Sequence, residues 1–142
     1  MLPLENNKCS LCVYSSFIFL TNVFLAVYYE YYLYAFLFLL LTITSVFHHT
    51  KESFYTNLID KIAVYCVIFY GGFIFYNKYK EDQMNIIKPC LIILTFLSVV
   101  FLYVYGYLTD DYSFHLDINI SHKYHSLLHL ISSIGHHIII VL

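Results

Sequence analysis

The stretch LCVYSSFIFLTNVFLAVYYEYYLYAFLFLLLTITSVF, residues 11–47, decides the fold, because Glu30 is its only charged residue. A helix needs about 20 mostly apolar residues to cross a bilayer, so this run is too long for one crossing and sufficient for two. Glu30 lies in a cluster of tyrosines, which is typical of a membrane interface. We therefore predict two helices, over about 11–29 and 31–49, joined by a tight turn at Tyr28–Tyr32.

The remainder of the chain contains three more apolar segments separated by polar connections. They predict helices over about 58–77, 89–107 and 122–142. Pro89 suits the first turn of a helix, where its missing N–H is not needed. The expected fold class is all-α: one integral membrane domain over residues 1–142, a polytopic membrane helix bundle of about five transmembrane helices.

The composition supports a membrane location. Hydrophobic residues make up 61% of the chain and charged residues 11%, against roughly 45–50% and about 25% in soluble domains. A water-soluble fold of this size could not bury so much apolar surface. The net charge of -2 argues against a nucleic-acid partner, which needs a basic patch. We expect a multi-pass integral membrane protein with membrane lipid as its partner.

Polar and ionisable residues gather at three of the predicted helix ends. Ser45 and His49 end the second helix, Asp60 begins the third, and His125 and His129 begin the fifth. Ionisable groups inside membrane spans are costly and mark functional sites. An odd total of five spans places all three helix ends on the same side of the membrane, so these residues are expected to converge.

The spacing of these residues indicates a metal centre. His125 and His129 are four residues apart, so both imidazoles project from one helix face. With His49 they form a three-histidine set that leaves the fourth tetrahedral position of zinc open. Zinc lowers the pKa of a bound water to about 7. Asp60 would accept a proton from that water or hold a ligand histidine, and Ser45 would orient the water or a substrate carbonyl.

The pattern Ser45-x-x-x-His49, then Asp60, then His125-x-x-x-His129 resembles the CREST superfamily of membrane hydrolases. That superfamily includes the alkaline ceramidases, the adiponectin-receptor-like proteins and the myomaker group. The resemblance implies His49, His125 and His129 as zinc ligands, with Ser45 and Asp60 as catalytic residues. It also implies hydrolysis of a lipid amide or ester. Family members usually have more spans, so this chain resembles a truncated form.

Two other functions fit the same residues. The first is a non-enzymatic membrane protein with a structural metal site that joins three helices. The second is a membrane haem protein, in which two histidines on facing helices ligate the iron. Metal content and a haem absorption band distinguish these alternatives from the hydrolase.

The sequence leaves the roles of four other histidines open. They are His48, His122, His136 and His137. His136 continues the stripe of His129, roughly 10 Å further along the helix. Gly71 and Gly72 are expected to mark a close contact between helices. Cys9 and Cys12 form a single C-x-x-C pair, which is a weak metal signal.

Overall fold

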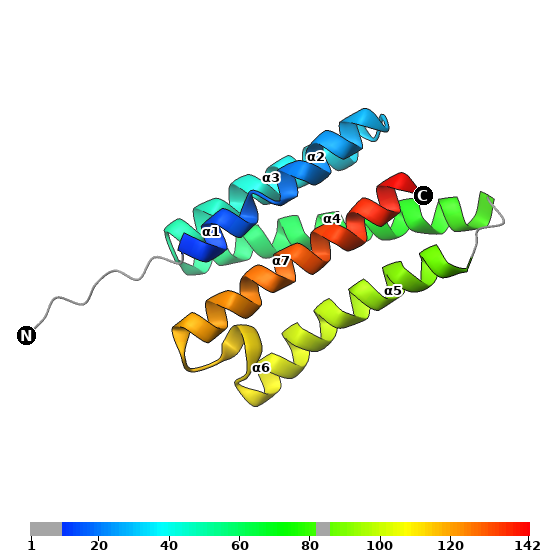
Figure 1. Cartoon of the computed structure of the whole chain (residues 1–142). Coiled ribbons are helices and arrows are strands. Elements are labelled where there is room, and N and C mark those ends of the chain that lie inside the picture. The colour runs from blue at the N-terminus through cyan, green and yellow to red at the C-terminus, as the bar shows by residue number, and fades with distance from the viewer. Residues whose placement is uncertain (1–9, 82–85) are drawn as a thin grey trace, which may run out of the picture.

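The computed structural model describes residues 10–81 and 86–142 and is an all-α bundle, as the sequence predicts (Figure 1). No strand occurs in these two ranges. The helices are α1 Ser10–Ser16, α2 Phe19–Tyr28, α3 Tyr32–Thr50, α4 Phe54–Glu81, α5 Ile87–Val100, the π-helical η1 Phe101–Tyr105, α6 Gly106–Thr109, the 3₁₀ helix η2 Tyr112–Phe114 and α7 Ile118–Val141. Cys9, half of the C-x-x-C pair, lies outside the described residues.

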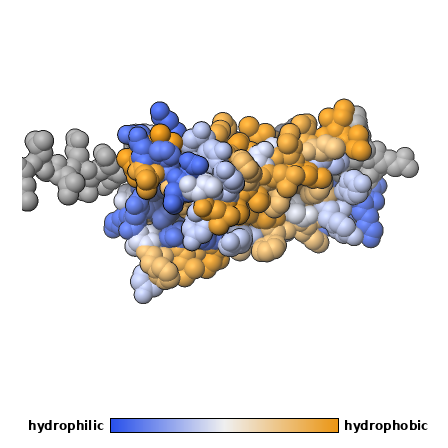
Figure 2. Space-filling model, turned by 90° about the horizontal axis from the view of Figure 1, so that it is seen from below, coloured by the Kyte–Doolittle hydropathy of each residue, from blue (hydrophilic) through white to orange (hydrophobic). Residues whose placement is uncertain are grey.

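Within residues 10–81 and 86–142, four helical stretches are long and apolar enough to cross a membrane. They are Leu11–Tyr28, Tyr32–Thr50, Phe54–Glu81 and Ile87–Phe114. The fifth long helix, α7, has 24 residues, but five histidines lower its mean hydropathy and it is not among the four. Figure 2 shows hydrophilic residues at the two ends of the bundle and a mostly hydrophobic surface between them.

The long helices run alternately up and down. The end of α3, the start of α4 and the start of α7 therefore lie at the same end of the bundle as α1 (Figure 1). Most helices extend a few residues beyond the predicted bounds, because hydropathy marks the apolar part of a helix whereas backbone hydrogen bonding continues into polar residues.

The first pass is not one continuous helix. Between α1 and α2, the N–H groups of Phe17 and Ile18 bind carbonyls three residues back, at 3.2 and 3.1 Å. The hydroxyls of Ser15 and Ser16 both donate to the carbonyl of Cys12, at 3.0 and 2.8 Å. Such bonds from serine to the preceding turn bend helices. The irregularity turns both serines into the bundle, where they are buried.

The predicted turn between the first two passes is present and closes around Glu30. Glu30 has a φ of 63°, in the left-handed region. The N–H of Tyr31 binds the Ala26 carbonyl at 2.8 Å, and the N–H of Glu30 binds the Val27 carbonyl at 3.0 Å. This pair of bonds is a Schellman motif, which satisfies carbonyls at the end of α2. The left-handed position of a Schellman motif is usually occupied by glycine, whereas here it is occupied by Glu30.

Gly71 marks a close contact between helices, as the sequence predicts, and Gly72 does not. Gly71 of α4 is buried against the hydroxyl of Tyr34 and the ring of His136, so a Cβ there would lie 2.9 Å from that ring. Gly72 is exposed, and a Cβ there would meet nothing within 4 Å. The close approach brings α3, α4 and α7 together around the buried Tyr34.

Candidate metal centre

The three predicted metal ligands come together at one end of the bundle. His49 lies in the last turn of α3, and His125 and His129 lie one turn apart in α7. One ligand nitrogen from each imidazole lies within 4.8 Å of the other two. The ring centroids are 4.8 Å apart for His49 and His125, 4.8 Å for His125 and His129, and 5.5 Å for His49 and His129. The group could hold a metal ion.

The hydrogen-bonding of the ring nitrogens of His49 and His129 is compatible with a bound metal ion. Nε2 of His49 is buried and has no hydrogen-bond partner, one of two such side-chain atoms in the described part of the chain. A buried polar atom without a partner costs about 1–3 kcal/mol, so its presence calls for an explanation such as an ion. Nδ1 of His129 lies 2.8 Å from Ser15 Oγ, which leaves Nε2 as the ligand atom.

Ser45 lies one turn before His49 on the inner side of α3. It is 1% exposed, and its Oγ lies 2.9 Å from Ser16 Oγ. Since Ser45 and His49 are four residues apart, they share a helix face. The predicted role of Ser45 towards a water or a carbonyl stays a prediction.

Asp60 lies on a neighbouring face. It is half-buried, and its Oδ1 accepts a hydrogen bond from Thr44 Oγ1 at 3.0 Å. Thr44 is one residue before Ser45, and successive helical residues are rotated by about 100°. His48, one turn after Thr44, also faces α4, with its Nδ1 3.3 Å from Thr56 Oγ1. Asp60 is not a member of the three-imidazole group, and its catalytic role stays a prediction.

His136 and His137 belong to a second polar layer, further along α7. His136 pairs with the Tyr34 hydroxyl. Nδ1 of His137 lies 2.7 Å from the Ser133 carbonyl and 3.1 Å from Asn22 Nδ2.

An aromatic layer separates this second polar layer from the metal centre. The ring of Phe19 lies 5.1 Å from that of His129 and 6.3 Å from that of Phe38. Phe38 in turn lies 5.2 Å from the ring of His136. The stripe of histidines on α7 is therefore divided into two sites.

Ser15 and Ser16 are the site residues that sequence reasoning missed. Both are buried where α1 ends, and each contacts a predicted site residue, His129 and Ser45 respectively. Adjacent serines within an apolar run were the available signal. That signal is weak, because serine is tolerated in apolar helices when it bonds to its own preceding turn.

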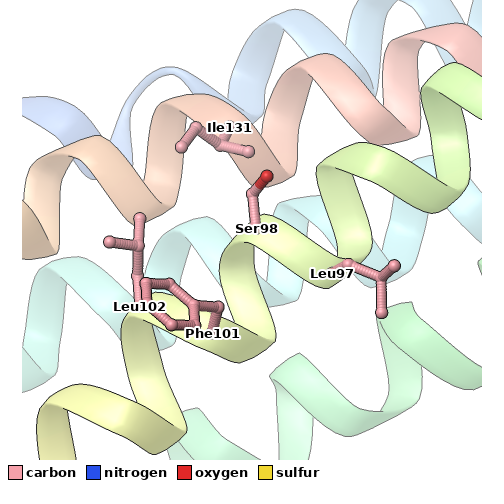
Figure 3. Close-up of a pocket in the computed structure, with 5 residues that line it drawn as sticks. All are labelled: Leu97, Ser98, Phe101, Leu102 and Ile131. Carbon is pink, nitrogen blue, oxygen red and sulfur yellow. The ribbon is translucent and has the colours of Figure 1, made fainter.

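A shallow apolar groove lies elsewhere, between α5–η1 and α7. Figure 3 shows the side chains that line it, Leu97, Ser98, Phe101 and Leu102 on one side and Ile131 on the other. None of the three histidines lines this groove.

We compared the chain with protein-family models, curated proteins and solved structures, and found no match in any of the three comparisons. The resemblance to the CREST superfamily therefore depends on the residues quoted for it above.

Proposed function

We propose that this chain is a multi-pass integral membrane protein that hydrolyses an amide or ester bond of a membrane lipid at a zinc ion. His49, His125 and His129 would hold the ion. The observation that carries the proposal is the convergence of these three imidazoles within 4.8 Å around a buried, unpartnered Nε2 of His49. Four long apolar helices support the membrane location, and α7 would be a fifth span.

The ligand set favours zinc and an open coordination position. Imidazole nitrogen is a ligand that suits zinc, and catalytic zinc sites use three protein ligands and leave the fourth position for water or substrate. When bound, zinc supplies a Lewis acid that polarises a carbonyl and acidifies a water. The resemblance to the CREST superfamily supports a lipid amide or ester as substrate.

In this proposal two polar residues near the histidine end of the bundle assist the reaction. Asp60, whose Oδ1 accepts a hydrogen bond from Thr44, would be the carboxylate that takes the proton released by the attacking water. Ser45, on the same face of α3 as His49, would orient the attacking water by accepting a hydrogen bond from it. A lipid would enter sideways from the bilayer, because the histidines lie within the bundle near one of its ends.

The first test is the metal content of the full chain purified in detergent. We expect about one zinc per chain by elemental analysis, and its loss in His49→Ala and His129→Ala. His115→Ala is the matched control, because His115 lies in the loop before α7 and accepts a bond from the Asp117 N–H. Wild-type protein without zinc, or equal zinc in all variants, would overturn the proposal.

The second test is lipid turnover. We expect wild-type protein in vesicles of a natural lipid extract to release fatty acid that mass spectrometry detects. A chelator should abolish the release and added zinc should restore it, whereas His129→Ala should release none. A zinc-loaded wild-type protein that releases no fatty acid would exclude the hydrolase.

A structural metal site is a second candidate function, and one observation favours it. The ligands come from the last turn of α3 and from α7, which also meet where His136 contacts Tyr34 and Phe38, so an ion would add a second link between these two helices near the end of the bundle. This candidate predicts zinc without lipid turnover and a large loss of thermal stability on chelation. A haem protein would instead show a Soret band in its absorption spectrum.

A further inference from the structure

Ser15 contacts one of the proposed metal ligands and has a fixed hydrogen-bonding role. It is 7% exposed, and its Oγ has two partners. One is the carbonyl oxygen of Cys12, at 3.0 Å, and the other is Nδ1 of His129, at 2.8 Å. A serine hydroxyl has a single hydrogen to donate but accepts through two lone pairs.

Counting hydrogens assigns the donor in each contact. The carbonyl of Cys12 can only accept, so the hydroxyl hydrogen of Ser15 goes to that carbonyl. The contact with His129 then needs a hydrogen on Nδ1, which donates to Ser15 Oγ. This is the arrangement in which both contacts are hydrogen bonds. A neutral imidazole with a hydrogen on Nδ1 has an unprotonated Nε2, and that nitrogen can bind a metal.

The neighbouring serine repeats the arrangement. The hydroxyl of Ser16 donates to the same carbonyl of Cys12 at 2.8 Å, so in the 2.9 Å contact between Ser16 and Ser45 the donor is Ser45. The hydroxyl hydrogen of Ser45 is thereby committed, and Ser45 can act towards the site only as an acceptor. The two serines at the end of α1 thus fix the hydrogen-bonding roles of His129 on α7 and Ser45 on α3.

We propose that Ser15 is a positioning residue that holds His129 in the Nδ1–H tautomer and in the orientation that presents Nε2 to the metal. This inference rests on the proposed metal centre. Ligand histidines commonly donate their second ring nitrogen to a fixed acceptor, and loss of such an acceptor costs roughly 10- to 100-fold in metal affinity. Here the acceptor is a buried hydroxyl held by the backbone of α1.

The test compares zinc affinity of the full chain in detergent by competition with a chelating dye. We expect Ser15→Ala to bind zinc roughly 10- to 100-fold more weakly than wild type. Thr21→Ala should bind like wild type, because the Thr21 hydroxyl is exposed and donates to the Ile18 carbonyl in its own span. Ser15→Thr keeps the hydroxyl and should recover most of the affinity, which would separate the acceptor from a general loss of folding.

A second measurement reads the tautomer directly. In ¹⁵N-histidine NMR spectra of zinc-free wild-type protein, we expect the His129 imidazole to be locked with its hydrogen on Nδ1, in addition to that of His137, whose Nδ1 lies 2.7 Å from the Ser133 carbonyl. His129→Ala should remove the His129 signal, and Ser15→Ala should convert it to a mixture of tautomers. Altered packing alone would not produce this change.

The possible results separate the two proposals. A wild-type protein that binds no zinc overturns the metal centre and this inference together. Zinc binding that is the same in wild type and Ser15→Ala, with an unchanged tautomer, overturns the role of Ser15 and leaves the metal centre standing.

Discussion

Replacement of Asn22 by alanine should weaken the packing of α2 against α7. Asn22 is fully buried. Its Nδ2 donates to the Ser133 carbonyl at 3.1 Å, and its Oδ1 accepts from the Ser133 hydroxyl at 2.5 Å. Hydrogen bonds between membrane helices are worth about 0.6 kcal/mol each, so these two sum to roughly 1.2 kcal/mol. The small cavity left behind raises the expected loss of unfolding free energy to about 1–2 kcal/mol.

A double-mutant cycle with Ser133→Ala isolates the side-chain pair. Ser133→Ala removes the hydroxyl bond to Asn22 and the 3.3 Å contact of that hydroxyl with Nδ1 of His137, and it leaves the Ser133 backbone carbonyl in place. The coupling energy between the two substitutions should therefore be roughly 0.6 kcal/mol and at most about 1.7 kcal/mol. The assay is reversible unfolding of the zinc-free full chain by SDS in mixed micelles, followed by far-UV circular dichroism.

The control for this cycle is Thr21→Ala, which removes an exposed hydroxyl next to Asn22 and should change stability by less than about 0.5 kcal/mol. Additivity of the two substitutions within about 0.3 kcal/mol would mean that the pair is not coupled. An Asn22→Ala variant as stable as wild type would refute the claim that this network joins α2 to α7.

The same unfolding assay checks three further predictions. Gly71→Ala should lower the free energy of unfolding by about 1–3 kcal/mol, because the added Cβ has no room. Gly72→Ala should raise it by up to about 1 kcal/mol through helix propensity, and equal effects of the two substitutions would contradict the close helix contact at Gly71. Glu30→Gly should raise the free energy of unfolding by up to about 1 kcal/mol, because glycine adopts the left-handed φ without strain. A lower free energy of unfolding would argue against the left-handed turn at Glu30. Lys78→Met should lower the free energy of unfolding by about 1–2 kcal/mol, because the Nζ of Lys78 donates to the carbonyls of Ile139 and Ile140 at 3.1 and 2.8 Å. Lys80→Met, at an exposed position, should stay within about 0.5 kcal/mol of wild type, and an equal loss there would count against the Lys78 bonds.

Much of the site could be predicted because helix geometry is local. The four-residue spacing of His125 and His129 places both rings on one face, whatever surrounds the helix. Their convergence with His49 needed one further step, the alternation of helix direction along the chain. That step depends only on the number of long helices, which apolar segment length indicates.

The placement of Asp60 shows where such reasoning stops. Hydropathy places Asp60 near the correct end of the bundle, but it cannot give the rotation of α4 about its axis. That rotation directs Asp60 towards Thr44, on a different face of α3 from His49.

The sequence by itself determined the all-α class, the long apolar helices and the gathering of three histidines at one end. Tertiary structure alone decided that Ser15 reaches His129, that Phe19 and Phe38 divide the histidines of α7 into two layers, and that Gly71 rather than Gly72 faces a neighbouring helix. The physical reason is that helices suited to lipid are apolar on all sides. Hydrophobicity therefore does not distinguish the buried face from the exposed one, and the packing of side chains between helices makes that choice.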